Sequence, residues 1–200
     1  MKTLLVVAHP RQSSLTWAVA ELFSAAIIAR GHSVERANLV QEGFDPTLQT
    51  PDEPDWADPA KTYSANVHAE MRRIERNAAT VLVFPVWWWS LPAVMKGWID
   101  RVWNNGWAYG ANQYPHKRVW MIGIAGGVRD YYAKRGYDHA MRAQLEVGVL
   151  EYCDIPDRRM EILYGAIEGP QYVEQILVRA RELAAEFCAG TPPARSSDAT

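Results

Sequence analysis

Three consecutive tryptophans stand between a buried apolar run and a helix-like segment, at residues 87–89. The run before them, residues 80–84, is apolar and rich in β-branched side chains, which is typical of a central strand in a parallel sheet. Pro85 ends this strand because proline has no amide to donate. The carboxyl end of a strand is where open α/β sheets bind ligands. The turn therefore predicts one wall of a pocket for a large, flat, aromatic ligand, although a hydrophobic corner or a subunit contact would use the same residues.

A second loop has the composition of an anion site. His9 follows an apolar run, and Ser13, Ser14, Leu15 and Thr16 then lead into a helix-like segment. Small hydroxyl residues and free amides at the start of a helix bind phosphate. An ordinary N-cap made by either serine would leave the same pattern. Neither a G-x-G-x-x-G motif nor a Walker P-loop occurs, so a Rossmann dinucleotide site or a nucleoside triphosphate site is not indicated.

A third loop, residues 125–132, follows another apolar run that ends at Ile124. Paired glycines, Gly126 and Gly127, let the backbone approach a ligand plane, although a plain turn also uses them. Together the three loops are more specific than any one of them. They indicate a flavin, with its phosphate at a helix N-terminus and its isoalloxazine between an aromatic wall and backbone amides.

These loops need a scaffold that brings them together. Strands are expected at residues 3–8, 32–39, 80–84, 119–124 and 159–163, and helices at 15–30, 64–76, 92–102, 136–149 and 171–187. Alternating strands and helices with right-handed crossovers predict an α/β fold, a three-layer doubly wound five-stranded parallel sheet. The flavodoxin-like order 2-1-3-4-5 is the natural one for five strands. Residues 40–63 are polar and proline-rich, and are expected to wrap over the surface.

The bulk composition limits the class of protein. A chain of 200 residues with net charge −2 fits one domain, residues 1–189, and carries no broad basic field for nucleic acid. Cys153 and Cys188 are far apart and no signal peptide is seen, so a cytoplasmic location is expected. No apolar run approaches the roughly 20 residues that cross a bilayer. Residues 190–200 are expected to form a disordered tail, and no metal site is predicted.

Four stretches, in this order, resemble a known family: residues 8–10 with the two serines that follow, 85–102, 106–110 and 125–127. The stretch 85–102, PVWWWSLPAVMKGWIDRV, is the most specific of them. The sequence resembles the flavodoxin-like NAD(P)H:quinone oxidoreductases, which include DT-diaphorase, drug-activity modulators and ancillary proteins of potassium-efflux systems. Residues 133–200 match only in length and helical pattern.

The resemblance implies a homodimer that binds FAD, or alternatively FMN, and transfers hydride from NAD(P)H to a quinone by a ping-pong mechanism. It assigns the flavin phosphate and ribityl chain to His9, Ser13, Ser14, Leu15 and Thr16. It assigns the isoalloxazine to Pro85, Val86, Trp87, Trp88, Trp89, Ile124, Ala125, Gly126 and Gly127. Tyr132 is the implied catalytic residue, near the pyrimidine edge of the flavin, while Tyr131 is expected to point elsewhere. Trp107 and Tyr109 are implied to bind the acceptor by covering the pocket of the partner subunit.

The sequence departs from the family at two positions. Asp138, with His139 beside it, stands where mammalian members carry a histidine, and Thr16 replaces an asparagine. The choice between FAD and FMN, the choice between NADH and NADPH, and the acceptor all stay open. An alternative class is a regulatory flavoprotein with low turnover that docks on a membrane transporter.

Overall fold

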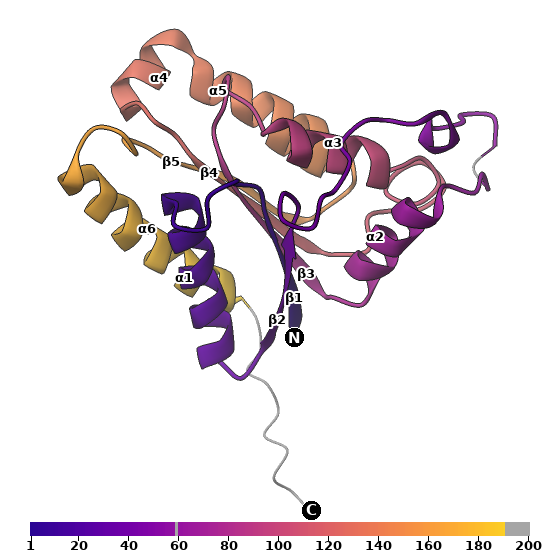
Figure 1. Cartoon of the computed structure of the whole chain (residues 1–200), viewed down its shortest axis with the longest axis horizontal. Coiled ribbons are helices and arrows are strands. Elements are labelled where there is room, and N and C mark those ends of the chain that lie inside the picture. The colour runs from indigo at the N-terminus through magenta and orange to yellow at the C-terminus, as the bar shows by residue number, and fades with distance from the viewer. Residues whose placement is uncertain (59, 191–200) are drawn as a thin grey trace, which may run out of the picture.

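The computed structural model describes residues 1–58 and 60–190. Its centre is a five-stranded parallel sheet in the order β2-β1-β3-β4-β5 (Figure 1). The strands are β1 (Lys2–Val7), β2 (Ser33–Asn38), β3 (Ala79–Pro85), β4 (Arg118–Ile124) and β5 (Asp157–Leu163). The predicted flavodoxin-like fold is confirmed in both strand order and direction.

Helices cover both faces of the sheet. They are α1 (Leu15–Ala29), α2 (Ala65–Glu75), α3 (Ala93–Val102), α4 (Arg129–Arg135), α5 (Tyr137–Arg142), the π-helical segment η2 (Ala143–Glu151) and α6 (Pro170–Ala189). The apolar sides of α1 and α6 pack on one face, and those of α2, α3, α5 and η2 pack on the other (Figure 1). The result is the predicted three-layer arrangement.

The central strand β3 shows why its sequence is apolar without interruption. All seven of its residues are buried. Leu82 and Phe84 face the α2 and α3 layer, whereas Val81 and Val83 face α1 and α6. Covering both faces removes the polar alternation that a half-exposed strand would show.

The segment after β4 differs from the expectation. A loop is predicted through Tyr132, but α4 already begins at Arg129. The helix predicted at 136–149 is formed by α5 and η2, and Gly136 separates it from α4 with a left-handed φ of +69°. Glycine tolerates this conformation without steric cost, so the chain can end α4 and begin α5 at this single residue.

The excursion at 40–63 contains one short helix, η1 (Thr50–Asp52). A buried ion pair fixes it to the body of the protein, because the Arg101 guanidinium lies 2.8 Å from the Asp52 carboxylate. Burial alone would raise the pKa of Asp52, but hydrogen bonds from Arg101 and Ser64 outweigh this and lower the pKa below its ordinary value. The excursion in turn brings the Trp56 ring to 5.6 Å from Tyr109.

Apart from Gly190, the tail predicted to be disordered lies outside the described residues. Across residues 1–58 and 60–190, no helix is long and apolar enough to cross a membrane. Cys153 and Cys188 are both buried and unpaired.

Candidate functional site

The carboxyl ends of β1, β3 and β4 meet at one edge of the sheet. The Ala8 amide donates to the Val83 carbonyl oxygen (3.3 Å), and the Val86 amide donates to that of Ile124 (2.8 Å). Beyond these bonds lies a pocket of about 240 Å³. Its lining comes from the segments after β3 and β4, namely Val86, Trp88, Trp89, Gly126, Gly127, Tyr131 and Tyr132. Five of the residues assigned to the isoalloxazine thus line one pocket, and the catalytic candidate lies in its wall.

The tryptophan turn (residues 87–90) builds one wall. Trp87 and Ser90 exchange backbone hydrogen bonds of 3.3 and 3.1 Å, and the two residues between them have positive φ angles, +50° at Trp88 and +54° at Trp89. Such turns normally use asparagine and glycine, because a larger side chain in this region costs about 1–3 kcal/mol. The Trp88 side chain is 87% exposed, so its own packing does not offset that cost. Backbone strain that no packing of the side chain offsets is typical of functional sites, so the exposed Trp88 indole points to a ligand.

The glycine segment (residues 125–127) builds a second wall from backbone. The carbonyl oxygens of Ala125, Gly126 and Gly127 accept hydrogen bonds from the amides of residues 165–167, at 2.9 to 3.3 Å. No described residue accepts from the amides of Gly126 or Gly127. A Cβ added at Gly127 meets nothing nearer than 3.8 Å, so it would project into the open pocket. The segment therefore offers two unused donors beside space for a flat ring.

Two adjacent tyrosines complete the pocket. Tyr132 is 5% exposed, and its ring packs edge-on against Tyr164 at 5.3 Å. Burial raises the pKa of the Tyr132 hydroxyl, and the neighbouring tyrosines raise it further, so the group remains a neutral donor. Tyr131 is 43% exposed but also lines the pocket. The expectation that Tyr131 points elsewhere is therefore wrong, because α4 places both tyrosines beside the glycine segment.

Tyr137 is a residue that the sequence argument missed. Its ring packs on Trp89 with centroids 4.3 Å apart, and it also contacts the rings of Tyr131 and Tyr132. Tyr137 thus packs the tryptophan turn against the two tyrosines of α4. The excess of tyrosine between residues 131 and 137 was the available signal, but Tyr131 and Tyr132 fell in a predicted loop and Tyr137 in a predicted helix, and nothing in the pattern directed these rings toward one another.

The first loop (residues 9–16) lies next to the tryptophan turn, with the rings of His9 and Trp87 6.2 Å apart. The Arg11 backbone amide donates a hydrogen bond to His9 Nδ1 at 3.0 Å. Nε2 is therefore the ring nitrogen that remains for a ligand. Burial lowers the pKa of His9, which favours the neutral ring. Ser14 is the N-cap of α1, since its hydroxyl accepts from the Trp17 amide at 3.3 Å.

The other residues of the first loop differ in their accessibility. Ser13 is exposed, Leu15 is half-buried and the Thr16 side chain is buried. Helix starts leave amides without intrahelical partners, and in the described chain nothing accepts from the amides of Leu15 and Thr16. These two residues therefore present backbone rather than side-chain donors. Their assignment to a phosphate remains a prediction.

Trp107 and Tyr109 lie away from this pocket. Trp107 Nε1 donates to the Glu75 carboxylate at 2.7 Å, and Tyr109 packs between Trp56 and Tyr152. Their role in covering a partner's pocket remains a prediction. Asp138 and His139 do not line the pocket either, and Asp138 accepts a hydrogen bond from the His139 amide at 2.9 Å.

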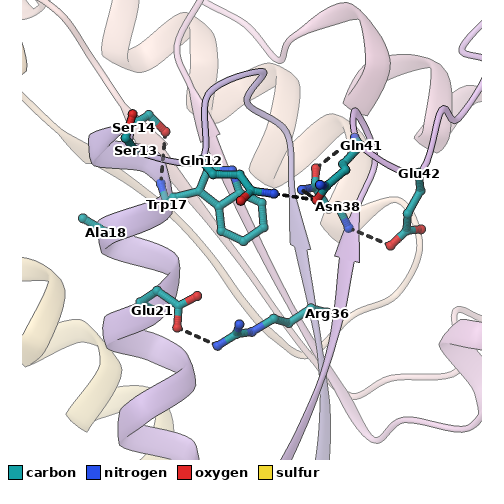
Figure 2. A pocket seen from close by; sticks show the side chains of 10 residues that line it. All are labelled: Gln12, Ser13, Ser14, Trp17, Ala18, Glu21, Arg36, Asn38, Gln41 and Glu42. Atoms are coloured by element: carbon teal, nitrogen blue, oxygen red, sulfur yellow. Dashed lines mark hydrogen bonds and ion pairs between the residues drawn. The ribbon is translucent and has the colours of Figure 1, made fainter.

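A larger cavity, about 500 Å³, opens on the other side of the first loop, between α1 and β2 (Figure 2). Several of its polar side chains are paired with one another. Gln12 donates to Gln41 (2.6 Å), and Arg36 donates to Glu21 (2.5 Å). The indole of Trp17 forms part of the lining. No local pattern marks this cavity, because its lining combines the first loop with one face of α1, the edge strand β2 and the residues after it.

Within residues 1–58 and 60–190, no group of three or more histidine, cysteine, aspartate or glutamate side chains is arranged to hold a metal ion. The absence of a metal site from the whole chain remains a prediction.

Comparisons with known proteins give a consistent result. A family model described as a flavodoxin-like fold matches residues 1–187. The chain is 33% identical over 186 residues to the NAD(P)H oxidoreductase YcaK of Escherichia coli (strain K12), covering 90% of this chain and 94% of the relative. It is 24% identical over 176 residues to the ribosyldihydronicotinamide dehydrogenase [quinone] of Homo sapiens, covering 76% of each.

Among solved structures, the chain is similar to an NAD(P)H:quinone oxidoreductase from Methanothermobacter marburgensis. The TM-score is 0.87 at 27% identity, and the match covers 94% of this chain and 96% of that one. The family model, over residues 1–187, includes all five strands, the pocket and the loops around it. The chain belongs to the flavodoxin-like family, among relatives that are NAD(P)H oxidoreductases and quinone reductases.

Proposed function

We propose that the protein is a flavin-dependent oxidoreductase that takes hydride from NAD(P)H and passes two electrons to a quinone or a related aromatic acceptor. The observation that carries the proposal is the pair of unused amides at Gly126 and Gly127 beside a pocket walled by aromatic rings. Flat ligands with polar edges need both features. The relatives named above support the same activity.

The residues present fit a flavin. Val86, Trp88 and Trp89 would hold the faces of the isoalloxazine, and the amides of Gly126 and Gly127 would donate to its polar edge. The first loop would hold the phosphate, through His9 Nε2 and the free amides at the start of α1. When bound, the flavin supplies the two-electron hydride chemistry.

Tyr132 is assigned the catalytic role. Hydride transfer leaves negative charge at the pyrimidine edge, and a neutral hydroxyl aimed there stabilises that charge more in the transition state than in the ground state. The raised pKa of Tyr132 keeps its proton in place for this purpose. The open side of the pocket would accept the donor and the acceptor in turn, which is the condition for a ping-pong sequence.

FAD rather than FMN is the proposed cofactor. FAD extends FMN by an adenosine monophosphate joined to the FMN phosphate, and the cavity of about 500 Å³ begins at the same loop, at Ser13 and Ser14. Amide and carboxylate groups line that cavity, and they suit the edge of a base and a ribose.

We also propose a homodimer in a reducing compartment such as the cytoplasm. Trp56, Tyr109 and Tyr152 form an aromatic cluster in which two of the side chains are more than half exposed. Exposed apolar clusters of this kind usually mark a contact surface. The two free cysteines fit a reducing environment.

The test is to denature the purified protein, identify the flavin it releases, and then titrate acceptors in steady state with NADPH and NADH. Stoichiometric FAD and rapid quinone-dependent oxidation of either donor are the expected results. A protein without flavin would contradict the proposal. Bound flavin with slow turnover on every acceptor would instead support the regulatory alternative.

A further inference from the structure

Two arginines next to the pocket stand apart from most of the charged groups in the molecule. The guanidinium carbon of Arg135 lies 3.9 Å from the centre of the Tyr131 ring, and that of Arg129 lies 4.9 Å from the centre of the Tyr164 ring. In the part of the chain that the structure describes, neither forms an ion pair with a carboxylate. By contrast, Arg73 pairs with three glutamates.

Each arginine stacks on a tyrosine that lines the pocket or lies next to it. Tyr131 lines the pocket itself, and Tyr164 packs against Tyr132, which also lines it. The Arg135 guanidinium therefore lies one ring from the pocket, whereas the Arg129 guanidinium lies two rings away and lines a neighbouring cavity with Tyr164 and Glu161. A guanidinium stacked on an aromatic face keeps its N–H donors at its edge, where they remain free to meet an anion.

The chemistry of the reactants determines which anion this is. Quinones carry no charge, whereas a reduced nicotinamide dinucleotide carries a diphosphate between its two nucleosides. When the nicotinamide enters the pocket, the diphosphate must lie outside it, near the rim. Planar guanidinium groups match phosphate oxygens in pairs, which a carboxamide or a hydroxyl cannot do.

We propose that Arg135 and Arg129 recognise the diphosphate of the hydride donor, which makes this protein selective for nicotinamide dinucleotides over uncharged dihydronicotinamide riboside. The inference rests on the proposed function. Both arginines lie on α4, where Asp130 is the one carboxylate, and Asp138 follows on α5; these two carboxylates limit the net positive charge of the rim. Selectivity therefore comes from the two stacked guanidiniums rather than from a broad positive field.

The test compares two donors at a fixed quinone concentration with flavin-loaded protein. Arg135→Gln should lower kcat/KM for NADPH by about fivefold, as expected for one solvent-exposed charge contact. The double variant Arg129→Gln/Arg135→Gln should lower it by about tenfold or more. Both variants should leave kcat/KM for dihydronicotinamide riboside within about twofold of wild type, since that donor has no phosphate.

Two further variants act as controls. Arg135→Lys should retain part of the NADPH activity, because it keeps the charge but loses the planar fork. Lys117→Gln removes one exposed charge at the opposite end of the sheet, just before β4. This variant should leave kcat/KM for both donors unchanged. High salt should weaken NADPH use by the wild type and have little effect on the double variant.

Several outcomes would overturn the inference. Equal losses with both donors would mean that Arg135 acts only through the packing of Tyr131. Unchanged NADPH kinetics in the double variant would mean that the rim does not meet the diphosphate. A wild type that oxidises the riboside but not NADPH would overturn the inference and leave the flavin oxidoreductase intact, whereas a flavin-loaded wild type that oxidises neither donor would overturn both.

Discussion

The two ends of the sheet differ in whether their polar groups have partners within the chain. At the amino end, the Glu35 carboxylate receives hydrogen bonds from Arg76 and Asn77 and pairs with Lys2 at 2.8 Å. The Arg118 guanidinium, at the start of β4, pairs with Asp157 at the start of β5. Charges at this end are matched by neighbours in the same chain.

At the carboxyl end, several groups around the pocket of the tryptophan turn have no such partner among the described residues. The amides of Gly126 and Gly127 are unused, Arg135 stacks on a ring without a carboxylate, and Trp88 is strained and exposed. Unsatisfied donors and strain cost free energy, so they persist where something else compensates for them. The contrast indicates that the amino end contributes to stability and that the carboxyl end is arranged for ligands.

The largest effect is expected from Gly127→Val, which fills the ligand end. The new side chain would occupy the open space beside the tyrosines. Flavin affinity should fall by about 30- to 150-fold, corresponding to about 2–3 kcal/mol of steric cost. Flavin titration monitored by fluorescence measures this, with circular dichroism as the control for folding. Wild-type affinity in a folded variant would show that the glycine segment is not at the cofactor.

A smaller loss is expected from Tyr132→Phe, which removes a donor and leaves the ring. Flavin reduction by NADPH should slow about tenfold, or about 1.4 kcal/mol, with the cofactor retained. Stopped-flow absorbance gives the rate. Tyr131→Phe is the matched variant, and it should lose less because its exposed hydroxyl is already solvated. A greater loss for Tyr131→Phe than for Tyr132→Phe would contradict the assignment.

At the amino end, Glu35→Gln should affect stability and spare the cofactor. Arg76, with Lys2 and Asn77, lowers the pKa of Glu35 from 4.5 to about 2. A carboxyl with a depressed pKa stabilises the fold above its unfolded pKa, and this contribution is lost as the pH falls from about 4.5 through 2. The variant should lose about 1 kcal/mol at neutral pH, after allowance for solvent screening.

Urea unfolding at neutral and acidic pH tests this prediction. The stability difference between wild type and Glu35→Gln should shrink as the pH falls, while flavin affinity stays the same. Loss of flavin in this variant would break the contrast between the two ends.

The smallest expected effect is a gain in stability, from Trp88→Gly. Trp88→Gly relieves a left-handed backbone and removes an exposed ring, so the free energy of unfolding should rise by about 0.5–1 kcal/mol without ligand. The same variant should bind flavin more weakly. Trp89→Gly is the matched control, because it also relieves strain but loses the stack on Tyr137. Thermal melts with and without flavin measure both, and a destabilised Trp88→Gly would mean that the turn holds no strain.

The sequence was sufficient for the sheet because its strands are covered on both faces. Uninterrupted apolar runs such as the one ending at Phe84 have few other structures available, and their order follows from crossover rules. It was also sufficient to place the tryptophan turn and the glycine segment together, since loops after neighbouring parallel strands share one edge.

What the sequence could not supply are features that depend on contacts far apart in the chain. The ion pair between Arg101 and Asp52 joins residues 49 positions apart, and no local pattern marks it. The left-handed backbone of Trp88 opposes the preference of tryptophan and follows from the closure of the turn. The contact of Tyr137 with Trp89 required knowing that α4 starts early and that Gly136 turns the chain.

The most direct measurement follows the backbone amides of both ends by NMR as flavin is added to the flavin-free protein. We predict that the resonances of Gly126 and Gly127 shift and that their hydrogen exchange slows at stoichiometric flavin. The Ser33 amide, which is already bonded to the Met1 carbonyl at the amino end, should stay unchanged. Flavin that binds and leaves both glycine amides unperturbed would contradict the assignment of the carboxyl end as the cofactor site.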